Sequence, residues 1–329
     1  MSAQASPIVG THLGIGDRLG RWRVRWGIGR KRYRVSPGLY RVGEPGQESP
    51  VLVTANYRLS FDSLRSELPG IDAWMLVLDT DGVNVWCAAG KGTFGTDELV
   101  RQIQAVDLSE IVRHRQLIVP QLGATGVAAH EVLRASGFKV IYGPIRARDL
   151  AAFLRAGMRA TEDMRRVTFT FVERLELVGV EAVTVLKWLV LIVVVMMLLP
   201  GADSMLERFG TAVRRSAPVL AGFLVGAVLV PMLLPWIPGR AFSLKGALAG
   251  AIVVGATILL LPDAHTFLGK IQVFLFGTVA ASFFAMQFTG ATTFTSHSGV
   301  EWEMRRALPL QLGAVVLASG IGIVRWLMG

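Results

Sequence analysis

Five long apolar segments in the C-terminal half constrain the fold of this chain more than any other feature. They cover residues 181–199, 217–237, 244–262, 271–288 and 308–327. A helix needs about 20 mostly apolar residues to cross the hydrocarbon core of a bilayer, within a range of roughly 17–25. Helix-breaking prolines fall at segment ends, namely Pro200, Pro235, Pro238 and Pro262. The pattern predicts an all-α transmembrane domain of about five helices over residues 181–329.

The predicted spans carry almost no charge. The first contains Lys187 beside Trp188, a pair that suits the bilayer interface near the start of a helix. Proton relays and ion pathways require ionisable groups inside the membrane, so the spans are interpreted as an anchor rather than a pump. The mean hydropathy of the whole chain, +0.49, is too high for an ordinary soluble protein.

The half before the spans has an α/β pattern. Buried strands are predicted at residues 51–54, 74–79, 116–119 and 139–142, with amphipathic helices at 60–68, 97–106 and 126–136 between them. Continuous apolar strands that alternate with helices are typical of a mostly parallel sheet covered on both faces. The chain is therefore predicted to have a basic N-terminal arm over residues 1–34 and a Rossmann-like α/β domain over residues 35–180.

Small or polar residues follow the predicted strands. Thr54, Gln121, Gly123 and Gly143 all lie at strand ends. In open parallel sheets, ligands bind at the carboxyl ends of the strands. Two interpretations are open at this point: these residues contact a cofactor, or they simply make turns.

The only cysteine, Cys87, lies in a stretch of small residues. Residues 79–82 are predicted as a turn and residues 83–86 as a short strand, so that Cys87 falls where a helix begins and its amides stabilise negative charge. One cysteine excludes an internal disulfide and an iron–sulfur cluster or zinc finger held by this chain alone. The Gly-Lys-Gly-Thr run at 90–93 is not a P-loop, because Val85 stands where that motif needs its first glycine.

The string Asn84-Val85-Trp86-Cys87-Ala88-Ala89-Gly90-Lys91 resembles the cap-helix signature of the HgcA family, the corrinoid proteins of bacterial mercury methylation. That signature reads Asn-(Val/Ile)-Trp-Cys-Ala-(Ala/Gly)-Gly-Lys, and every position matches. The resemblance extends to residues 53–57, 120–124, 143–144 and a polar loop at 289–300. The family is related to the large subunit of the corrinoid iron–sulfur protein.

The resemblance implies a cofactor and a set of site residues. The cofactor is a cobamide, a cobalt corrinoid of the cobalamin type, with Cys87 as the catalytic residue and the lower axial ligand to cobalt. The cap over the corrin would comprise Asn84, Val85, Trp86, Ala88, Ala89, Gly90, Lys91, Gly92 and Thr93. Contacts from the strand ends would come from Thr54, Gln121, Gly123 and Gly143.

The resemblance also implies an activity and partners. The chain would be a membrane-anchored methyltransferase that passes a methyl group from methyl-Co(III) cobamide to its substrate Hg(II), forming methylmercury. Low-potential electrons must come from a separate ferredoxin-like 4Fe–4S donor, because the single cysteine cannot hold a cluster. The methyl donor would be linked to methyltetrahydrofolate.

Two other functions are weighed against this one. The first is a membrane protein that binds or transports a cobamide or a metal without transferring a methyl group; it is weakened by the lack of polar residues in the spans. The second is a thiol redox sensor, disfavoured because the chain has no second cysteine to resolve an oxidised Cys87.

Charges near the spans predict the orientation in the membrane. Arg240 and Lys245 bracket the second short loop, on the same side as the arginine-rich N-terminal half. This places the α/β domain in the cytoplasm and makes the chain a multi-pass protein of the cytoplasmic (inner) membrane. The loop at 289–307 lies on that side too; it either reaches the α/β domain or forms a solvated turn.

The N-terminal arm combines arginine with tryptophan in the run Arg-Trp-Arg-Val-Arg-Trp at 21–26. Such a run can bind nucleic acid or rest on an anionic lipid surface. In a chain tethered to a bilayer, no nucleic acid partner is expected. A solvated arm and a contact with lipid headgroups are the two interpretations kept.

Overall fold

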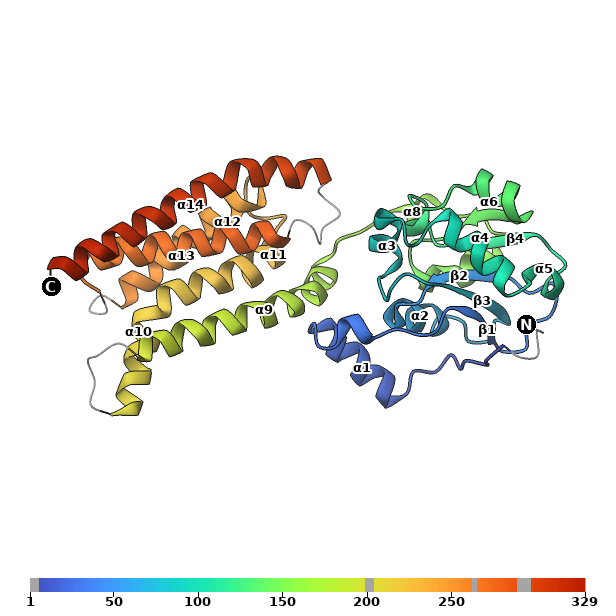
Figure 1. The fold of residues 1–329 in the computed structure, drawn as a ribbon, viewed down its shortest axis with the longest axis horizontal. Helices are drawn as coiled ribbons and strands as arrows, with labels where there is room; N and C mark the ends of the chain where they lie inside the picture. The colour runs from blue at the N-terminus through green and yellow to red at the C-terminus, as the bar shows by residue number, and fades with distance from the viewer. Residues whose placement is uncertain (1–5, 199–203, 262–264, 289–296, 329) are drawn as a thin grey trace. The chain divides into compact units, whose positions relative to one another are not determined.

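The computed structural model describes residues 6–198, 204–261, 265–288 and 297–328 (Figure 1). The chain divides into two compact units. The first comprises Met1–Val24 and Ile28–Thr168, and the second comprises Arg25–Gly27 and Phe169–Gly329. The predicted fold class is confirmed, because an α/β unit with parallel strands precedes a unit with five long apolar helices.

The first unit is built on a five-stranded sheet in the order β1-β3-β2-β4-β5. The strands are β1 (Gly38–Val42), β2 (Val51–Ala55), β3 (Ala73–Leu78), β4 (Gln116–Val119) and β5 (Lys139–Tyr142). Strands β2 to β5 pair in parallel at the predicted positions, whereas β1 pairs antiparallel with β3 at the edge. Strand β1 was not predicted, because only Leu39 and Val42 of it are buried and they make no apolar run.

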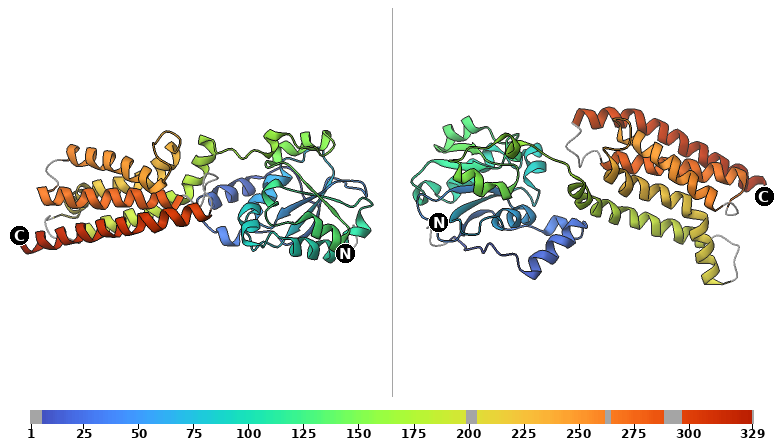
Figure 2. Two further views of the ribbon diagram at one scale, coloured as in Figure 1. Left: turned by 90° about the horizontal axis from the view of Figure 1, so that it is seen from above. Right: turned by 180° about the vertical axis from the view of Figure 1, so that it is seen from behind.

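Helices cover both faces of this sheet (Figure 2). One face packs on α4 (Thr96–Ala105) and α6 (Ala129–Ser136), the other on α2 (Arg58–Arg65) and α7 (Leu150–Arg155). The remaining helical elements are α1 (Ile15–Arg25), η2 (Arg30–Arg32), α3 (Val85–Lys91), α5 (Leu108–Ile111), η3 (Gln121–Gly123), η4 (Ala147–Asp149) and α8 (Glu162–Arg165). Consecutive strand residues point to opposite faces, which is why fully apolar strands supply both cores.

The order of the strands creates one switch point. From β2 the chain crosses to β3 on one side, and it then returns to place β4 on the other side of β2. Ligands of open α/β sheets bind outside the carboxyl ends of the strands where the winding reverses. The gap between the ends of β2 and β4 is therefore the place where this fold offers a site.

The N-terminal arm contacts the domain through residues 9–17, whereas Trp22 and Arg23 of the run at 21–26 are exposed. The Val9 amide donates to Arg41 O on β1 at 2.8 Å. Arg65 of α2, which is buried, donates to Gly10 O at 2.7 Å and to Asp17 Oδ2 at 2.8 Å. A buried guanidinium needs several acceptors. The arm supplies three of the acceptors of Arg65, namely Gly10 O, His12 O and Asp17 Oδ2. The arginine-rich composition of the arm does not reveal these long-range hydrogen bonds.

Asp17 is the electrostatic link between the arm and α2, and its loss should undock the arm. Burial raises the pKa of Asp17, but hydrogen bonds from Arg65 and Arg58 outweigh burial and hold that pKa below the ordinary 3.8. The stabilisation is therefore complete above pH 3.8 and is lost as the pH falls through the lower folded pKa. Asp17→Asn should weaken docking by about 1–3 kcal/mol. Faster hydrogen exchange over residues 7–20 at neutral pH would show it.

The control for this variant is Asp97→Asn, at an exposed position in the first turn of α4. It removes the same charge from the same unit without touching the arm. Equal exchange over residues 7–20 in the two variants would contradict the role given to Asp17.

Among the residues that the structure describes, the second unit has five helices that are long and apolar enough to cross a membrane, judged by length and composition. They are α9 (Phe171–Met197); α10 (Met205–Leu224), continued by the π-helical turn η5 (Val225–Leu229) and by α11 (Val230–Leu233); α12 (Phe242–Leu260); α13 (Phe267–Gln287); and α14 (His297–Met328). All five predicted spans lie largely within these helices.

All five helices start before the predicted spans, and α9, α10 and α14 do so by ten or more residues. Thr170 and Glu173 form a capping box that begins α9 at Phe171, so the unit boundary falls after Thr168 rather than after residue 180. Residues 297–307, predicted as part of a loop, form the first turns of α14. The rest of that predicted loop, residues 289–296, lies outside the described residues.

Small residues bring three of these helices into close contact. A Cβ on Gly222 of α10 would overlap the backbone of Gly277 of α13, and one on Gly246 of α12 would lie 2.7 Å from Ala285 Cβ. Helices in lipid associate through such packing, since lipid is as apolar as their side chains.

Buried ionisable groups in this unit bond to helix ends. Arg174 donates to Phe169 O at 2.6 Å and to Met232 O at 3.2 Å. Lys245, expected beside a loop, is buried in the first turn of α12 and donates to Leu234 O at 2.6 Å. Met232 O and Leu234 O lie at the C-terminal end of α11, where carbonyls lack helical partners, so both cations have a structural role.

Candidate functional site

Cys87 lies in the first turn of α3. Asn84 is the N-cap of this helix, and its Oδ1 accepts a hydrogen bond from Cys87 N at 2.8 Å. The helix therefore starts at Val85, and the predicted short strand at 83–86 is wrong. The apolar residues Val83 and Val85 favour a strand by composition. The N-cap hydrogen bond of Asn84 stabilises a helix at this position instead.

The two faces of α3 differ. Val85, Ala88 and Ala89 are buried against the domain, and the two small alanines let the helix lie close to it. Trp86 is 41% exposed, Gly90 is exposed, and Cys87 between them is half-buried. A Cβ added to Gly90 would meet nothing within 4 Å, so open space lies on the helix one turn from the thiol.

A buried asparagine holds the turn before α3. Asn56, directly after β2, accepts hydrogen bonds from Thr80 N at 3.1 Å and Gly82 N at 2.9 Å. Its Nδ2 donates to Asp79 Oδ1 at 2.8 Å, and Thr80 Oγ1 lies 2.9 Å from Asn56 Oδ1. Residues 79–82 form the predicted turn, with Asp81 and Gly82 at positive φ. The Asn56 side chain thus fixes where α3 begins.

The far end of α3 is fixed by packing. Gly92 ends the helix at φ 83°, a left-handed conformation that favours glycine. The next apolar residue, Phe94, is fully buried. Its ring leaves no room for a side chain at Gly123, and its backbone oxygen leaves none at Gly126. The loop after β4 therefore sits directly under the loop after α3.

These contacts bring the predicted site together at the switch point. Helix α3 touches both β2 and η3, the segment that follows β4. Gly123 and Thr54 are buried there, and Gly143 is buried at the end of β5. A Cβ added to Gly143 would lie 2.9 Å from Ile118 Cγ2. Gly123 and Gly143 have protein on the side where a side chain would be, so close packing of the loops explains their presence.

Gln121 is the predicted strand-end residue with spare binding capacity. Its Oε1 is buried and has no hydrogen-bond partner among the described residues. A buried acceptor without a partner costs about 1–3 kcal/mol. An incoming donor group would relieve that cost.

The arrangement suits a large flat ligand that carries a soft metal. Cys87 offers one thiol, the glycine beside it leaves space, and the thiolate is the ligand type that softer transition metals prefer. Within the described residues, no cluster of three or more His, Cys, Asp or Glu side chains could hold a metal ion alone. A metal here would have to bring most of its ligands with it, as a macrocycle does.

Residues 28–154 match the family model described as CO dehydrogenase/acetyl-CoA synthase delta subunit. The gamma subunit of the acetyl-CoA decarbonylase/synthase complex of Methanopyrus kandleri is 35% identical over 127 residues, which is 38% of this chain and 27% of that protein. The corrinoid/iron–sulfur protein large subunit of Moorella thermoacetica is 33% identical over 127 residues, 38% of this chain and 28% of that protein.

The gamma subunit from Archaeoglobus fulgidus is 35% identical over 114 residues, 34% of this chain and 24% of that protein. The chain thus spans about a quarter of the length of the curated relatives it matches. The family match covers the sheet and α3 and ends before the five apolar helices. The predicted relationship to the corrinoid iron–sulfur protein large subunit is confirmed for this domain.

Proposed function

We propose that this protein is a membrane-anchored, corrinoid-dependent methyltransferase that binds a cobamide on the exposed face of α3. The observation that carries the proposal is the position of Cys87. It is half-buried at the switch point of an α/β domain similar to a corrinoid protein, next to open space above Gly90. Cys87 is the proposed lower axial ligand to cobalt.

A bound cobamide would supply a cobalt centre able to accept a methyl group and give it up. The residues of the chain would hold and orient it. Cys87 would bind the cobalt through its sulfur, Trp86 offers an exposed aromatic surface next to it in the helix, and Gln121 offers an acceptor that has no partner among the described residues. Ala88, Ala89, Lys91, Gly92 and Thr93 complete the proposed cap, and Thr54, Gly123 and Gly143 form the strand ends beneath it.

Hg(II) is the proposed methyl acceptor. The support is the eight-residue string at 84–91, which matches the cap-helix signature of the mercury-methylating family at every position. The Cys87 sulfur would hold a bound cobamide, and the cobamide would supply the methyl group for transfer to an electrophile such as Hg(II).

Two protein partners are proposed, an electron donor and a methyl donor. With one cysteine it can hold no iron–sulfur cluster of its own, so a ferredoxin-like 4Fe–4S protein is the proposed electron donor. A donor linked to methyltetrahydrofolate is proposed to supply the methyl group. Both would meet the α/β domain in the cytoplasm, the side that the positive charges near the spans favour.

The test uses the full-length chain in detergent, loaded with methylcobalamin and exposed to Hg(II). Loss of the methyl-cobalt absorbance together with formation of methylmercury supports the proposal. A loaded protein that keeps its methyl group in the presence of Hg(II) contradicts it. That outcome would favour the alternative, a membrane protein that binds or carries a cobamide.

Filling the space above α3 should block the cofactor without harming the protein. Gly90→Leu puts a side chain where nothing lies within 4 Å and replaces a glycine inside a helix, so the apoprotein should gain about 0.5–1 kcal/mol. Cobalamin binding to the full-length chain should fall at least about 10-fold, measured by retention of corrin absorbance on gel filtration.

Gly90→Ala should have a smaller effect on binding. Ala135→Leu, at an exposed position of α6 in the same unit, should have none. Unchanged cobalamin binding in Gly90→Leu would place the cofactor elsewhere on the domain.

A further inference from the structure

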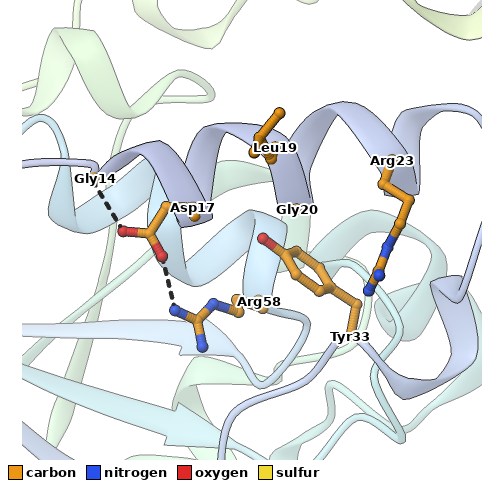
Figure 3. Close-up of a pocket in the computed structure, with 8 residues that line it drawn as sticks. Gly14, Asp17, Leu19, Gly20, Arg23, Tyr33 and Arg58 are labelled. Carbon is orange, nitrogen blue, oxygen red and sulfur yellow. Dashed lines mark hydrogen bonds and ion pairs between the residues drawn. The ribbon is translucent and has the colours of Figure 1, made fainter.

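Helix α1 has an inner face built for contact with the domain. Asp17, Gly20 and Val24 recur at helical spacing on this face, and Val24 is buried. Asp17 points to Arg58, and Gly20 lies over the Tyr33 ring (Figure 3). A Cβ on Gly20 would lie 2.7 Å from the Tyr33 hydroxyl, so only glycine allows this close approach. The orientation of α1 on the domain is therefore fixed by its inner face.

The outer face of α1 is apolar and exposed. Ile15, Leu19 and Trp22 recur at i, i+4 and i+7, and they are 80%, 62% and 61% exposed. Leu19 points away from Tyr33 and Arg58 in Figure 3. A soluble helix that packs through one face normally presents polar residues on the other. Three large apolar side chains in one exposed row indicate a surface that binds an apolar partner.

Arginines flank the apolar row. At 100° per residue, Arg18 and Arg25 lie to one side of it and Arg23 to the other. The only acidic residue of α1 is Asp17, and it is occupied on the inner face by Arg58 and Arg65. Arg25 is paired with Glu176 at 3.1 Å, so Arg18 and Arg23 supply the positive charge beside the apolar row. Apolar side chains flanked by positive charge suit an anionic lipid surface.

A hollow of about 520 Å³ lies beside the helix, between α1, Tyr33 and Arg58. Arg23 and Arg58 both line it, and glycines form much of its wall, so backbone is accessible there (Figure 3). The Tyr33 hydroxyl is buried and has no hydrogen-bond partner among the described residues. Arg58 is paired with Asp17, which also lines the hollow, so Arg23 is the guanidinium there that suits a phosphate group.

We propose that α1 is an interfacial helix that binds the surface of an anionic phospholipid bilayer. Ile15, Leu19 and Trp22 enter the headgroup region, while Arg18 and Arg23 at the two sides of this row contact lipid phosphates. The chain's own five apolar helices, each long enough to span a bilayer, favour lipid over other polyanions. Nucleic acid would use the arginines but would leave a row of Ile and Leu without a partner.

This inference does not depend on the proposed function, because no cobamide is involved in it. The experiment uses the full-length chain in nanodiscs of phosphatidylcholine alone or mixed with phosphatidylglycerol. In a Cys87→Ser background, the variants Leu19→Cys and Leu133→Cys are labelled with an environment-sensitive fluorophore. Leu133 is the matched control, because it is a half-exposed leucine on another helix of the same unit.

In discs with phosphatidylglycerol, the label at position 19 should shift to the blue and be quenched by brominated lipid. The label at position 133 should show neither effect. Arg18→Gln and Arg23→Gln should each lower the docked-to-undocked ratio at position 19 about fivefold, and high salt should lower it further. Equal, water-like emission at both positions in anionic discs would overturn the proposal. So would a blue shift that persists without quenching by lipid, which would indicate a protein contact instead.

Discussion

Replacing Cys87 with alanine should remove the thiolate ligand from the bound cobamide and abolish methyl transfer to Hg(II). The expected loss of transfer exceeds the 10- to 100-fold typical of changes around a metal ligand, on the order of 100-fold or more. The measurement is methylmercury formed by the full-length chain loaded with methylcobalamin. The absorbance and Co(II) paramagnetic resonance spectra of the loaded chain report the ligand directly.

The structure explains why this variant should fold. Asn84 caps α3 by accepting from the backbone amide of residue 87, which alanine retains. The Cys87 side chain is only half-buried, and alanine favours helix. A cobalt spectrum identical in Cys87→Ala and the parent chain would remove Cys87 from the ligand set. Cys87→Ser, which keeps the size of the side chain, separates loss of the sulfur from loss of volume.

Asn56→Ala should loosen α3 although residue 56 does not reach the face that carries Cys87. The variant removes the acceptor of Thr80 N, Thr80 Oγ1 and Gly82 N, and the donor to Asp79. Thr80 is fully buried, and each buried polar group left unpaired costs about 1–3 kcal/mol. Amides in the first turn of α3 should exchange at least about 10-fold faster, measured by hydrogen exchange of the full-length chain.

Asn56→Asp is the matched control for this position. It keeps the acceptor oxygen but places a second carboxylate where the amide donated to Asp79 at 2.8 Å. Repulsion between the two carboxylates should loosen α3 at neutral pH, and protonation should restore the donor and slow exchange again at mildly acidic pH. Exchange in α3 that is the same in Asn56→Ala, Asn56→Asp and the parent chain would show that the turn holds without Asn56.

The sequence predicted the parts of the fold whose signal is local. Strands β2 to β5 are short apolar runs, and each apolar helix is long enough for a span, so both signals appear in a sequence window of the matching length. Strand β1 escaped prediction because its pairing with β3, and not its own composition, makes it a strand. The short strand predicted at 83–86 failed because the N-cap hydrogen bond of Asn84 outweighs the β-propensity of two valines.

The contacts that position α3 could not be predicted from the sequence. Asn56 and Thr80 are far apart in the chain and meet only when β2 and β3 pair, so nothing local identifies their hydrogen bonds. The same holds for Gly123 and Phe94. The site residues proposed on α3 rest on their order in the chain, which is a local pattern. The contact of the N-terminal arm with the domain was not predicted, because it depends on hydrogen bonds from Arg65, which lies on α2.

The solitary, half-buried thiol on α3 also gives the protein a built-in chemical reporter. Because Cys87 is the only cysteine in the chain, a thiol-specific reagent added to intact membranes has one target atom in this protein. A thiolate bonded to a metal is withheld from such reagents. The fraction that escapes alkylation in a native membrane would therefore count the molecules whose sulfur is engaged, without purification and without knowing the methyl acceptor.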